Sequence, residues 1–425
     1  MRYCGLASSV RVVAAFGVLA IATVEANAGG FAVREQSAFG QGSSFAGIAA
    51  GGDLSSMYWN PATMTQAPGI QAEFVASGIM PYAANTPSPA STLFFLGGTG
   101  NTAESAIVPA GYFSYQLTPD FWFGMSLNAP FGLSVSFPTL WAGAPYAAGD
   151  SHLRTYNASP SIAYRINNWI SVGAGVQIQY ADAGLSRSPI PGVAIAHLEG
   201  NGWGYGFTAG LTLTPTPTTT IGLGYRSFID QKIEGTLAVP PLLPTANVNT
   251  TLKLPDMISL GIRQQLGPQW TLLGTIEWTN WSRIGTATIN GALIPTAIPF
   301  QYDDGWFFAL GAEYRWNPAL TVRAGVGYEI SPITDRVRTP LLPDNDRIWL
   351  SAGATYNLTP ALSLDFAYSH LFVKDTSVNV GPGNPSYDGV FTYVGDVNSH
   401  VDIVSVALKY RWGATVAARP ALITK

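Results

Sequence analysis

A strict two-residue alternation of side chains is the feature that most restricts how this chain can fold. In Ile170–Tyr180 the apolar side chains share one face, and serine, glycine and glutamine share the other. The same alternation returns in Thr321–Tyr328 and in Arg347–Tyr356. Because successive side chains of a β-strand point to opposite faces, the pattern predicts strands with one apolar face and one small, partly charged face. The expected fold class is all-β.

The composition favours a membrane over water around those apolar faces. Only 11% of the residues are charged, whereas soluble domains carry roughly 25%. The net charge is −4 and no cluster of lysine and arginine occurs, which argues against nucleic acid as a partner, because phosphate binding needs concentrated positive charge. Cys4 is the only cysteine, so disulfides and thiolate sites are not expected.

The first residues have the pattern of a secretory signal peptide. Arg2 and Arg11 precede the apolar run Val12–Ala22, and Ala26-Asn27-Ala28 offers the small side chains that a signal peptidase needs. We predict a signal peptide over residues 1–28 with cleavage after Ala28. The run is shorter than the roughly 20 residues that span a bilayer. An exported chain without a spanning helix can reside in a membrane only as a closed barrel, because lipid offers unpaired amides no partner.

Short and long connections alternate along the chain, which places the turns at one end of a barrel and the loops at the other. A soluble sandwich would also show alternating strands. Aromatic side chains gather beside the short turns, as a membrane interface requires, and this favours the membrane barrel. They are Tyr164, Trp169, Tyr225, Trp270, Trp316, Tyr356, Tyr410 and Trp412.

We count about fourteen strands between residues 69 and 412, which predicts a 14-stranded antiparallel transmembrane β-barrel. An even number of strands puts both chain ends on one side of the membrane, here the periplasm. Residues 413–425 are predicted to be a periplasmic tail. The last strand, Val401–Trp412, ends in aromatic side chains and is expected to be recognised by the barrel-assembly machinery.

The segment before the first strand, residues 29–68, follows neither a helical nor a strand period. It is rich in glycine and serine and contains the turn Asn60-Pro61-Ala62. Side chains fill the interior of a barrel of about eight strands, whereas 16 to 18 strands leave an aqueous channel. A barrel of fourteen strands lies between these sizes, so its lumen has room for a further segment. We therefore predict that residues 29–68 form a compact plug, or hatch, inside the lumen.

Several collinear blocks together resemble the FadL family (OMPP1/FadL/TodX), outer-membrane transporters of long-chain fatty acids and other hydrophobic compounds. The blocks are Gly29-Gly30-Phe31, Asn60-Pro61-Ala62, Ala196–Gly210, Leu252–Gly261 and Asp344–Tyr356. The resemblance implies a fourteen-stranded barrel with an N-terminal hatch. It also implies that ligand binds in a lumenal pocket and leaves sideways through a gap in the barrel wall.

The third strand carries a candidate for that lateral opening. Pro130 cannot donate to a neighbouring strand and Gly132 permits a bend, so the ladder should be interrupted there. Asn128–Gly132, which includes Phe131, matches the kinked strand of the family. The alternative is that Pro130 marks only an edge or a bulge.

Candidate ligand contacts follow partly from the resemblance. It places Phe31 against the ligand, although a disordered terminus is the alternative. A fatty acid carboxylate would need a basic partner, and the candidates are Arg187, which matches a family arginine, and Arg283, Arg323 and Arg347. Each could instead pair with an acidic neighbour. Asp303-Asp304 stands where we align a lysine of the fatty acid transporters, so an aromatic or alkane hydrocarbon is a serious alternative substrate.

Apolar loop segments, Pro189–Ala196 and Val239–Leu243, are expected either to form a hydrophobic collection groove or to pack as a lid. The four histidines are dispersed without metal-ligand spacing, so we expect neither an enzyme nor a cofactor. The predicted function is outer-membrane transport of hydrophobic molecules, with a general porin as the remaining alternative. The expected partners are a hydrophobic small molecule, outer-membrane lipid and lipopolysaccharide, and the protein is expected to be a monomer.

Overall fold

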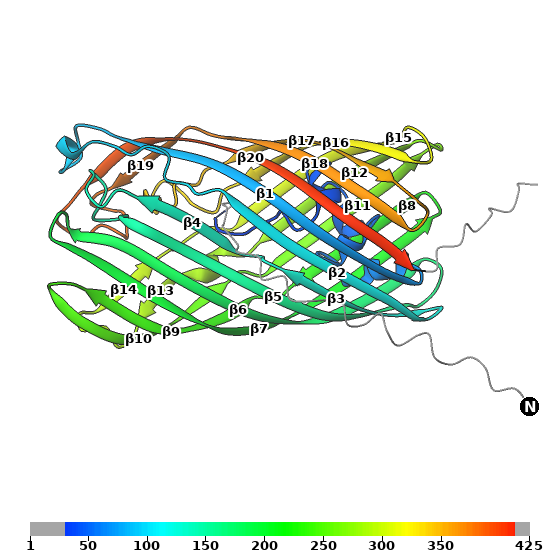
Figure 1. Ribbon diagram of the computed structural model, residues 1–425, viewed down its shortest axis with the longest axis horizontal. Helices are drawn as coiled ribbons and strands as arrows, with labels where there is room; N and C mark the ends of the chain where they lie inside the picture. The colour runs from blue at the N-terminus through cyan, green and yellow to red at the C-terminus, as the bar shows by residue number, and fades with distance from the viewer. Residues whose placement is uncertain (1–29, 413–425) are drawn as a thin grey trace, which may run out of the picture.

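The computed structural model describes residues 30–412, which form a closed antiparallel barrel of 14 strands around an N-terminal plug (Figure 1). The first strand, β1 (Ile70–Pro87), closes the barrel by pairing with the last, β20 (Tyr393–Trp412), from Ile70↔Trp412 onwards. The prediction of an all-β, 14-stranded barrel is confirmed. The predicted signal peptide, 1–28, and the predicted tail, 413–425, lie outside the described residues.

Ten of the barrel strands are continuous and four consist of two segments, so one sheet contains 18 segments. The continuous strands after β1 are β2 (Ala106–Thr118), β5 (Gly149–Arg165), β6 (Ile170–Ile190), β7 (Ala194–Thr216), β12 (Trp270–Thr279), β15 (Gly305–Arg315), β16 (Leu320–Ile330), β17 (Arg347–Asn357) and β20. The divided strands are β3 (Phe121–Asn128) with β4 (Gly132–Phe137), β8 (Thr219–Arg226) with β9 (Ile229–Val239), β10 (Leu243–Leu254) with β11 (Met257–Leu266), and β18 (Leu362–Val373) with β19 (Thr376–Val380).

Short turns join the strands at the end of the barrel where Trp412 lies, and long connections join them at the other end (Figure 1). We call these the turn end and the loop end. The connection between β12 and β15 contains a small hairpin, β13 (Thr286–Ile289) and β14 (Thr296–Pro299), and the short helix η5 (Trp281–Ile284). The connection between β1 and β2 contains the short helix η4 (Phe94–Leu96).

Some strands begin earlier than the apolar alternation predicts. We predicted that the last strand begins at Val401, whereas β20 begins at Tyr393. Strands β7 and β10 also begin early, at Ala194 and Leu243. The ladder continues beyond the apolar band with polar side chains, as in the pair Glu234↔Asn249. Alternating hydrophobicity marks the part of a strand that faces lipid, whereas backbone pairing does not end at that boundary.

The outward face of the barrel is apolar and its inward face is polar or small. On β17, for example, Leu350 is 56% exposed while its neighbour Trp349 is fully buried. Aromatic side chains at the turn end, such as Trp169 and Trp316, lie exposed on the outer surface. Such a surface suits a lipid environment flanked by an aromatic girdle. No helix among residues 30–412 is both long and apolar enough to cross a membrane.

The hatch is a chain of short helices buried inside the turn-end half of the barrel (Figure 1). They are α1 (Ala38–Gln41), η1 (Ile48–Ala50), η2 (Leu54–Tyr58) and η3 (Pro61–Gln66). Ser37, Asp53 and Asn60 cap three of them by accepting backbone N–H groups. The glycine-rich inner wall lets the hatch approach closely, because a Cβ on Gly210 would overlap the Asn60 side chain.

Candidate ligand cavity and wall gap

The turn Asn60-Pro61-Ala62 fastens the base of the hatch to the barrel wall. The Asn60 Oδ1 accepts from the Ala62 N–H across 3.0 Å, and its Nδ2 donates to the carbonyl oxygens of Ala49 (2.7 Å) and Leu211 (3.0 Å). Pro61 occupies the first position of η3, where its missing N–H costs nothing. One side chain therefore bonds η3, the end of η1 and strand β7.

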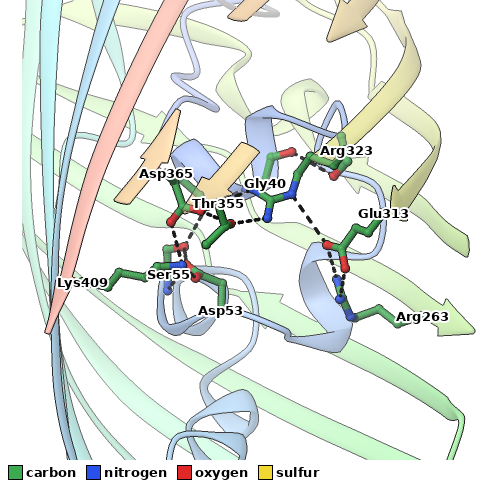
Figure 2. Close-up of polar contacts among 11 residues, drawn as sticks. Gly40, Asp53, Ser55, Arg263, Glu313, Arg323, Thr355, Asp365 and Lys409 are labelled. Atoms are coloured by element: carbon green, nitrogen blue, oxygen red, sulfur yellow. Dashed lines mark hydrogen bonds and ion pairs between the residues drawn. The ribbon is translucent and has the colours of Figure 1, made fainter. Parts of the chain in front are cut away.

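A buried ionic cluster fastens the middle of the hatch (Figure 2). Lys409 on β20 lies between Asp53 of the hatch and Asp365 on β18, with its Nζ 2.6 Å from an Asp365 oxygen. Arg323 on β16 approaches the same Asp365 (3.4 Å) and also Glu313 (3.8 Å). Burial alone would raise the pKa of Asp53, but the Lys409 ammonium holds that pKa well below its usual range. The ion pairs of this cluster therefore attach the hatch to the barrel wall.

Phe39 of α1 lies within this cluster and contacts three cations with its ring. The Arg323 guanidinium lies 4.1 Å from the ring centroid, the Lys409 Nζ 5.4 Å and the Arg263 guanidinium 5.5 Å. Cations over an aromatic face are attracted by the ring quadrupole. Phe39 therefore stabilises positive charges that the lumenal carboxylates neutralise.

The barrel wall is interrupted beside β3. Strand β2 pairs with β3 only as far as Gly111↔Leu127, and continuing that register would set Pro109 opposite Ala129. Neither Pro109 nor Pro130 has an N–H to donate, so no ladder forms between β2 and residues 129–132. Pairing resumes nearer the loop end, where Ala103 forms a bridge with Val135. The result is a bounded gap in the wall, which we call the wall gap.

The leading segment of the hatch lies against the wall gap from the inside. The Val33 N–H donates to the Pro130 oxygen (2.8 Å) and the Gly132 N–H donates to the Phe31 oxygen (2.9 Å). Ala32 and Phe131 form the antiparallel bridge between these two bonds. Residues 31–33 thus occupy the position of a short strand beside the gap.

Residues 30–412 line two cavities in the lumen, one on each side of Phe31. The upper cavity, toward the loop end, encloses about 1120 Å³ including its open mouth. Aliphatic and aromatic side chains dominate its lining, and no lysine or arginine of the described residues takes part. Its apolar lining includes Phe31, Leu133, Leu153, Ile233, Val248, Leu252, Ile289, Ile298, Phe300, Tyr302, Val337 and Leu342.

The lower cavity is smaller, about 800 Å³, and mixed in character. Arg34, Arg226, Glu277 and Glu329 contribute charge to it, and Pro130 bounds it at the wall gap. Arg226 is committed to the hatch, since its Nη1 donates to the Tyr58 oxygen across 3.0 Å. The lower cavity therefore connects the hatch surface to the gap.

Phe31 lies at the boundary between the cavities within an aromatic cluster. Its ring centroid is 4.7 Å from that of Trp281, and 6.2 Å from those of Phe131 and Phe300. Phe31 and Phe300 line the upper cavity, whereas Phe131 and Trp281 line the lower one. The aromatic cluster therefore lies between the upper cavity and the residues that bound the gap.

Charged residues hold the segment around Phe31 from three directions. The Gly30 N–H donates to Asp344 (3.0 Å), and the Arg34 guanidinium contacts Glu277 on β12 (2.5 Å) and Glu329 on β16 (3.6 Å). Burial raises the pKa of the neighbouring Glu35 to about 7. Neither oxygen of Glu35 has a hydrogen-bond partner among residues 30–412.

The four arginines considered as carboxylate partners do not line either cavity. Arg187 lies exposed on β6, and Arg283 pairs with Asp256 across 2.9 Å. Arg323 belongs to the ionic cluster that fastens the middle of the hatch. Arg347 pairs with Asp344 and approaches Glu329 at 3.8 Å. The arginines that do line a cavity, Arg34 and Arg226, were missed, although Arg34 is the only basic residue of the hatch segment.

The apolar loop segments and the acidic pair also have definite places. Ile190, Val193 and Leu242 expose their side chains at loop tips. Asp304 accepts from the Trp278 indole N–H across 3.0 Å and from the Ser282 N–H across 3.2 Å. The acidic residue therefore orders the start of the β12–β15 connection, from which Trp281 reaches Phe31.

The comparison with known proteins agrees with this geometry. The family described as "Outer membrane protein transport protein (OMPP1/FadL/TodX)" matches residues 19–412. The chain belongs to this family. Among its relatives, the long-chain fatty acid transport protein of Salmonella typhi is 29% identical over 407 residues, covering 86% of this chain and 92% of that protein. Outer membrane protein P1 of Haemophilus influenzae is 28% identical over 405 residues, covering 81% and 86%.

Solved structures of the OMPP1/FadL/TodX family share the fold. A Pseudomonas aeruginosa FadL homologue superimposes with a TM-score of 0.82 at 24% identity, covering 90% of this chain and 99% of that one. The Pseudomonas putida toluene transporter TodX gives a TM-score of 0.69 at 17% identity, covering 91% and 100%. The predicted membership of the FadL family is confirmed. It makes the chain one of a family of outer-membrane transport proteins.

Proposed function

We propose that this protein carries neutral hydrophobic molecules into the outer membrane. The ligand enters at the loop end, binds in the upper cavity, passes Phe31 and leaves sideways through the wall gap beside Pro130. The observation that carries the proposal is the lining of the upper cavity, which is predominantly apolar, includes His152 and Glu199 at its polar part, and contains no lysine or arginine side chain of the described residues. Such a cavity binds a hydrocarbon by burying its surface.

A fatty acid is the second candidate, because the relatives at 28–29% identity are named long-chain fatty acid transport proteins. Its carboxylate would have to be desolvated, and an unpaired buried charge is costly. Arg323 and Arg347 are already engaged by carboxylates. The arginines that line the lower cavity are engaged as well, since Arg34 contacts Glu277 and Glu329 and Arg226 donates to the Tyr58 oxygen. The carboxylate of a ligand in the upper cavity would reach them only by passing Phe31.

The orientation in the membrane is part of the proposal. The turn end and both chain termini face the periplasm, and the loop end faces the lipopolysaccharide leaflet. The aromatic outward side chains near the end of β20, Tyr410 and Trp412, suit recognition by the barrel-assembly machinery. We expect a monomer without catalytic activity or cofactor, and with the lateral opening formed by Asn128, Pro130, Phe131 and Gly132.

Uptake by cells that lack the gene tests the proposal. Radiolabelled toluene or an alkane should accumulate several-fold more slowly in the deletion strain, and the complementing gene should restore the rate, while oleate uptake stays unchanged. Loss of oleate uptake alone would assign the fatty acid as the ligand instead. Equal loss of a small sugar would indicate a general porin.

A further inference from the structure

Gln36 of the hatch is fully buried and faces the wall gap. Its Nε2 donates to the Ala129 oxygen across 2.9 Å, and its Oε1 accepts from the Ala129 N–H across 3.3 Å. These are the two bonds that a residue of a neighbouring antiparallel strand would exchange with Ala129. The side-chain amide of Gln36 therefore replaces the backbone partner that the gap removes.

The other backbone groups of the gap are also satisfied. The Pro130 oxygen and the Gly132 N–H bond to the leading segment of the hatch, as described above. The Phe131 N–H donates to the Thr155 Oγ1 (2.9 Å), and that hydroxyl donates to the Phe131 oxygen (2.8 Å). Lipid could satisfy none of these groups. At Ala129 both bonds depend on Gln36 alone.

A surrounding network orients the Gln36 amide. The Asn128 Nδ2 donates to the Gln36 Oε1 (3.1 Å) and to the Tyr112 hydroxyl (2.8 Å), and that hydroxyl donates to the Gln36 backbone oxygen (2.6 Å). The Gln36 Nε2 also donates to the Val33 oxygen across 3.1 Å. The donor and the acceptor of the amide are thus directed to opposite partners, which a carboxylate could not achieve because it has no donor.

We propose that Gln36 is the gate residue of the wall gap. While the gap is closed, its carboxamide completes the ladder at Ala129. The gap opens when this pair of hydrogen bonds breaks and residues 31–36 withdraw from residues 129–132. The inference rests on the proposed function only for what passes through the gap, since the closure itself depends on contacts within the protein.

Gln66 provides a matched control at the other end of the hatch. Its Nε2 donates to the Ala50 oxygen (2.9 Å), and its Oε1 accepts from the Gly52 N–H (3.1 Å). Gln66 therefore also binds a backbone N–H and a backbone oxygen with one amide, although the two groups belong to different residues and Gln66 is exposed; it does so inside the hatch and away from the gap. Gln66→Met tests whether a lost amide clamp loosens the hatch in general.

The test measures opening directly, without any ligand. In a Cys4→Ser background, Phe131→Cys is reconstituted into vesicles that contain a maleimide attached to a lipid acyl chain, so that only a thiol open to the bilayer reacts. Gln36→Met should raise the labelling rate about tenfold, because it removes both hydrogen bonds to Ala129 from the closed state, together with those to Val33 and Asn128. Gln66→Met should leave the rate within twofold. Heat-modifiable migration in SDS gels verifies that each variant remains a folded barrel.

An unchanged labelling rate in folded Gln36→Met would overturn the inference, as would an equal rise in Gln66→Met. The outcome is separate from that of the uptake experiment. If Gln36→Met opens the gap but the wild type takes up no hydrophobic compound, the inference about the gate stands and the proposed function fails.

Discussion

The backbone N–H of Val33 lies 2.8 Å from the carbonyl oxygen of Pro130 and donates to it. The plug of this barrel therefore does more than fill the lumen, since its residues 31–33 pair with the interrupted wall. The proposed gate couples withdrawal of residues 31–36 to opening of the gap, because the gap cannot widen while residues 31–33 stay bonded to it. The following predictions test parts of this arrangement.

Restoring the missing donors should close the gap. In the double variant Pro109→Val/Pro130→Val both strands regain an N–H, so β2 can extend its ladder past Leu127. We expect hydrocarbon uptake to fall at least fivefold at unchanged barrel content in the membrane. Pro160→Val is the control, because Pro160 lies within the continuous strand β5 opposite Met125. Undiminished uptake by the double variant would place the exit elsewhere.

Removing the Phe31 ring should join the two cavities. Phe31→Ala loses contacts with Trp281, Phe131 and Phe300, each worth about 0.5–1.5 kcal/mol beyond burial. A fluorescent apolar probe should leave the purified protein roughly fivefold faster in stopped-flow dilution. Phe95→Ala is the control, since that ring is 79% exposed at a loop tip. A dissociation rate equal in wild type and Phe31→Ala would show that Phe31 is no barrier.

Glu35 should make the folded protein less stable as the pH rises. Burial raises the pKa of Glu35 from 4.5 to about 7, so between these values the folded state holds a proton that the unfolded state has lost. Its contribution to the free energy of unfolding is full below pH 4.5, decreases by up to about 3 kcal/mol toward pH 7 and is then constant. The charged groups facing it are Arg34, Glu329 on β16 and Arg347 on β17.

Glu35→Gln should remove that pH dependence. Thermal unfolding in detergent, followed by circular dichroism, should give equal midpoints for wild type and variant at pH 4 and a higher midpoint for the variant at pH 8.5. Glu104→Gln serves as the control because Glu104 is exposed. A variant that is less stable than wild type at pH 8.5 would contradict the assignment of a neutral, unpaired carboxyl.

Lys409 should be essential for anchoring the hatch. Lys409→Met leaves Asp53 and Asp365 buried without their shared cation, and breaking a buried ion pair from one side costs about 3–5 kcal/mol. We expect a lower urea midpoint for unfolding and increased ion conductance through the barrel in planar bilayers. Lys374→Met, which removes an exposed lysine, should change neither quantity. A Lys409→Met barrel with wild-type conductance would mean that the remaining contacts hold the hatch alone.

The architecture was predictable because the membrane acts on each strand separately. Lipid on one side and a crowded lumen on the other impose a period of two on every crossing, and Ile170–Tyr180 shows that period without knowledge of its neighbours. The boundaries at the loop end were less predictable, since pairing there continues with polar residues such as Glu234 and Asn249. The interruption of the wall at Pro130 was predictable, because the missing backbone N–H is a property of that residue alone.

The partners of the site residues were not predictable, because they come from distant parts of the chain. Gln36 and Ala129 are 93 positions apart, and Arg34 and Glu277 are 243 apart. Arg323 and Arg347 were reasonable ligand contacts by residue type, yet acidic side chains of other strands neutralise them. A sequence shows which charges and amides exist but not which of them meet.

The sequence alone thus determined the cylinder, its lipid-facing surface and the presence of an irregular leading segment. The cylinder and its lipid-facing surface follow from an alternation of side chains that every strand repeats. The irregular segment is recognised because its side chains follow neither a helical nor a strand period. Only the tertiary structure decided that this segment completes the wall beside Pro130 and that no lysine or arginine of the described residues lines the upper cavity. Those properties depend on which side chains lie within hydrogen-bonding distance after the barrel has closed, and closure joins residues without regard to their separation along the chain.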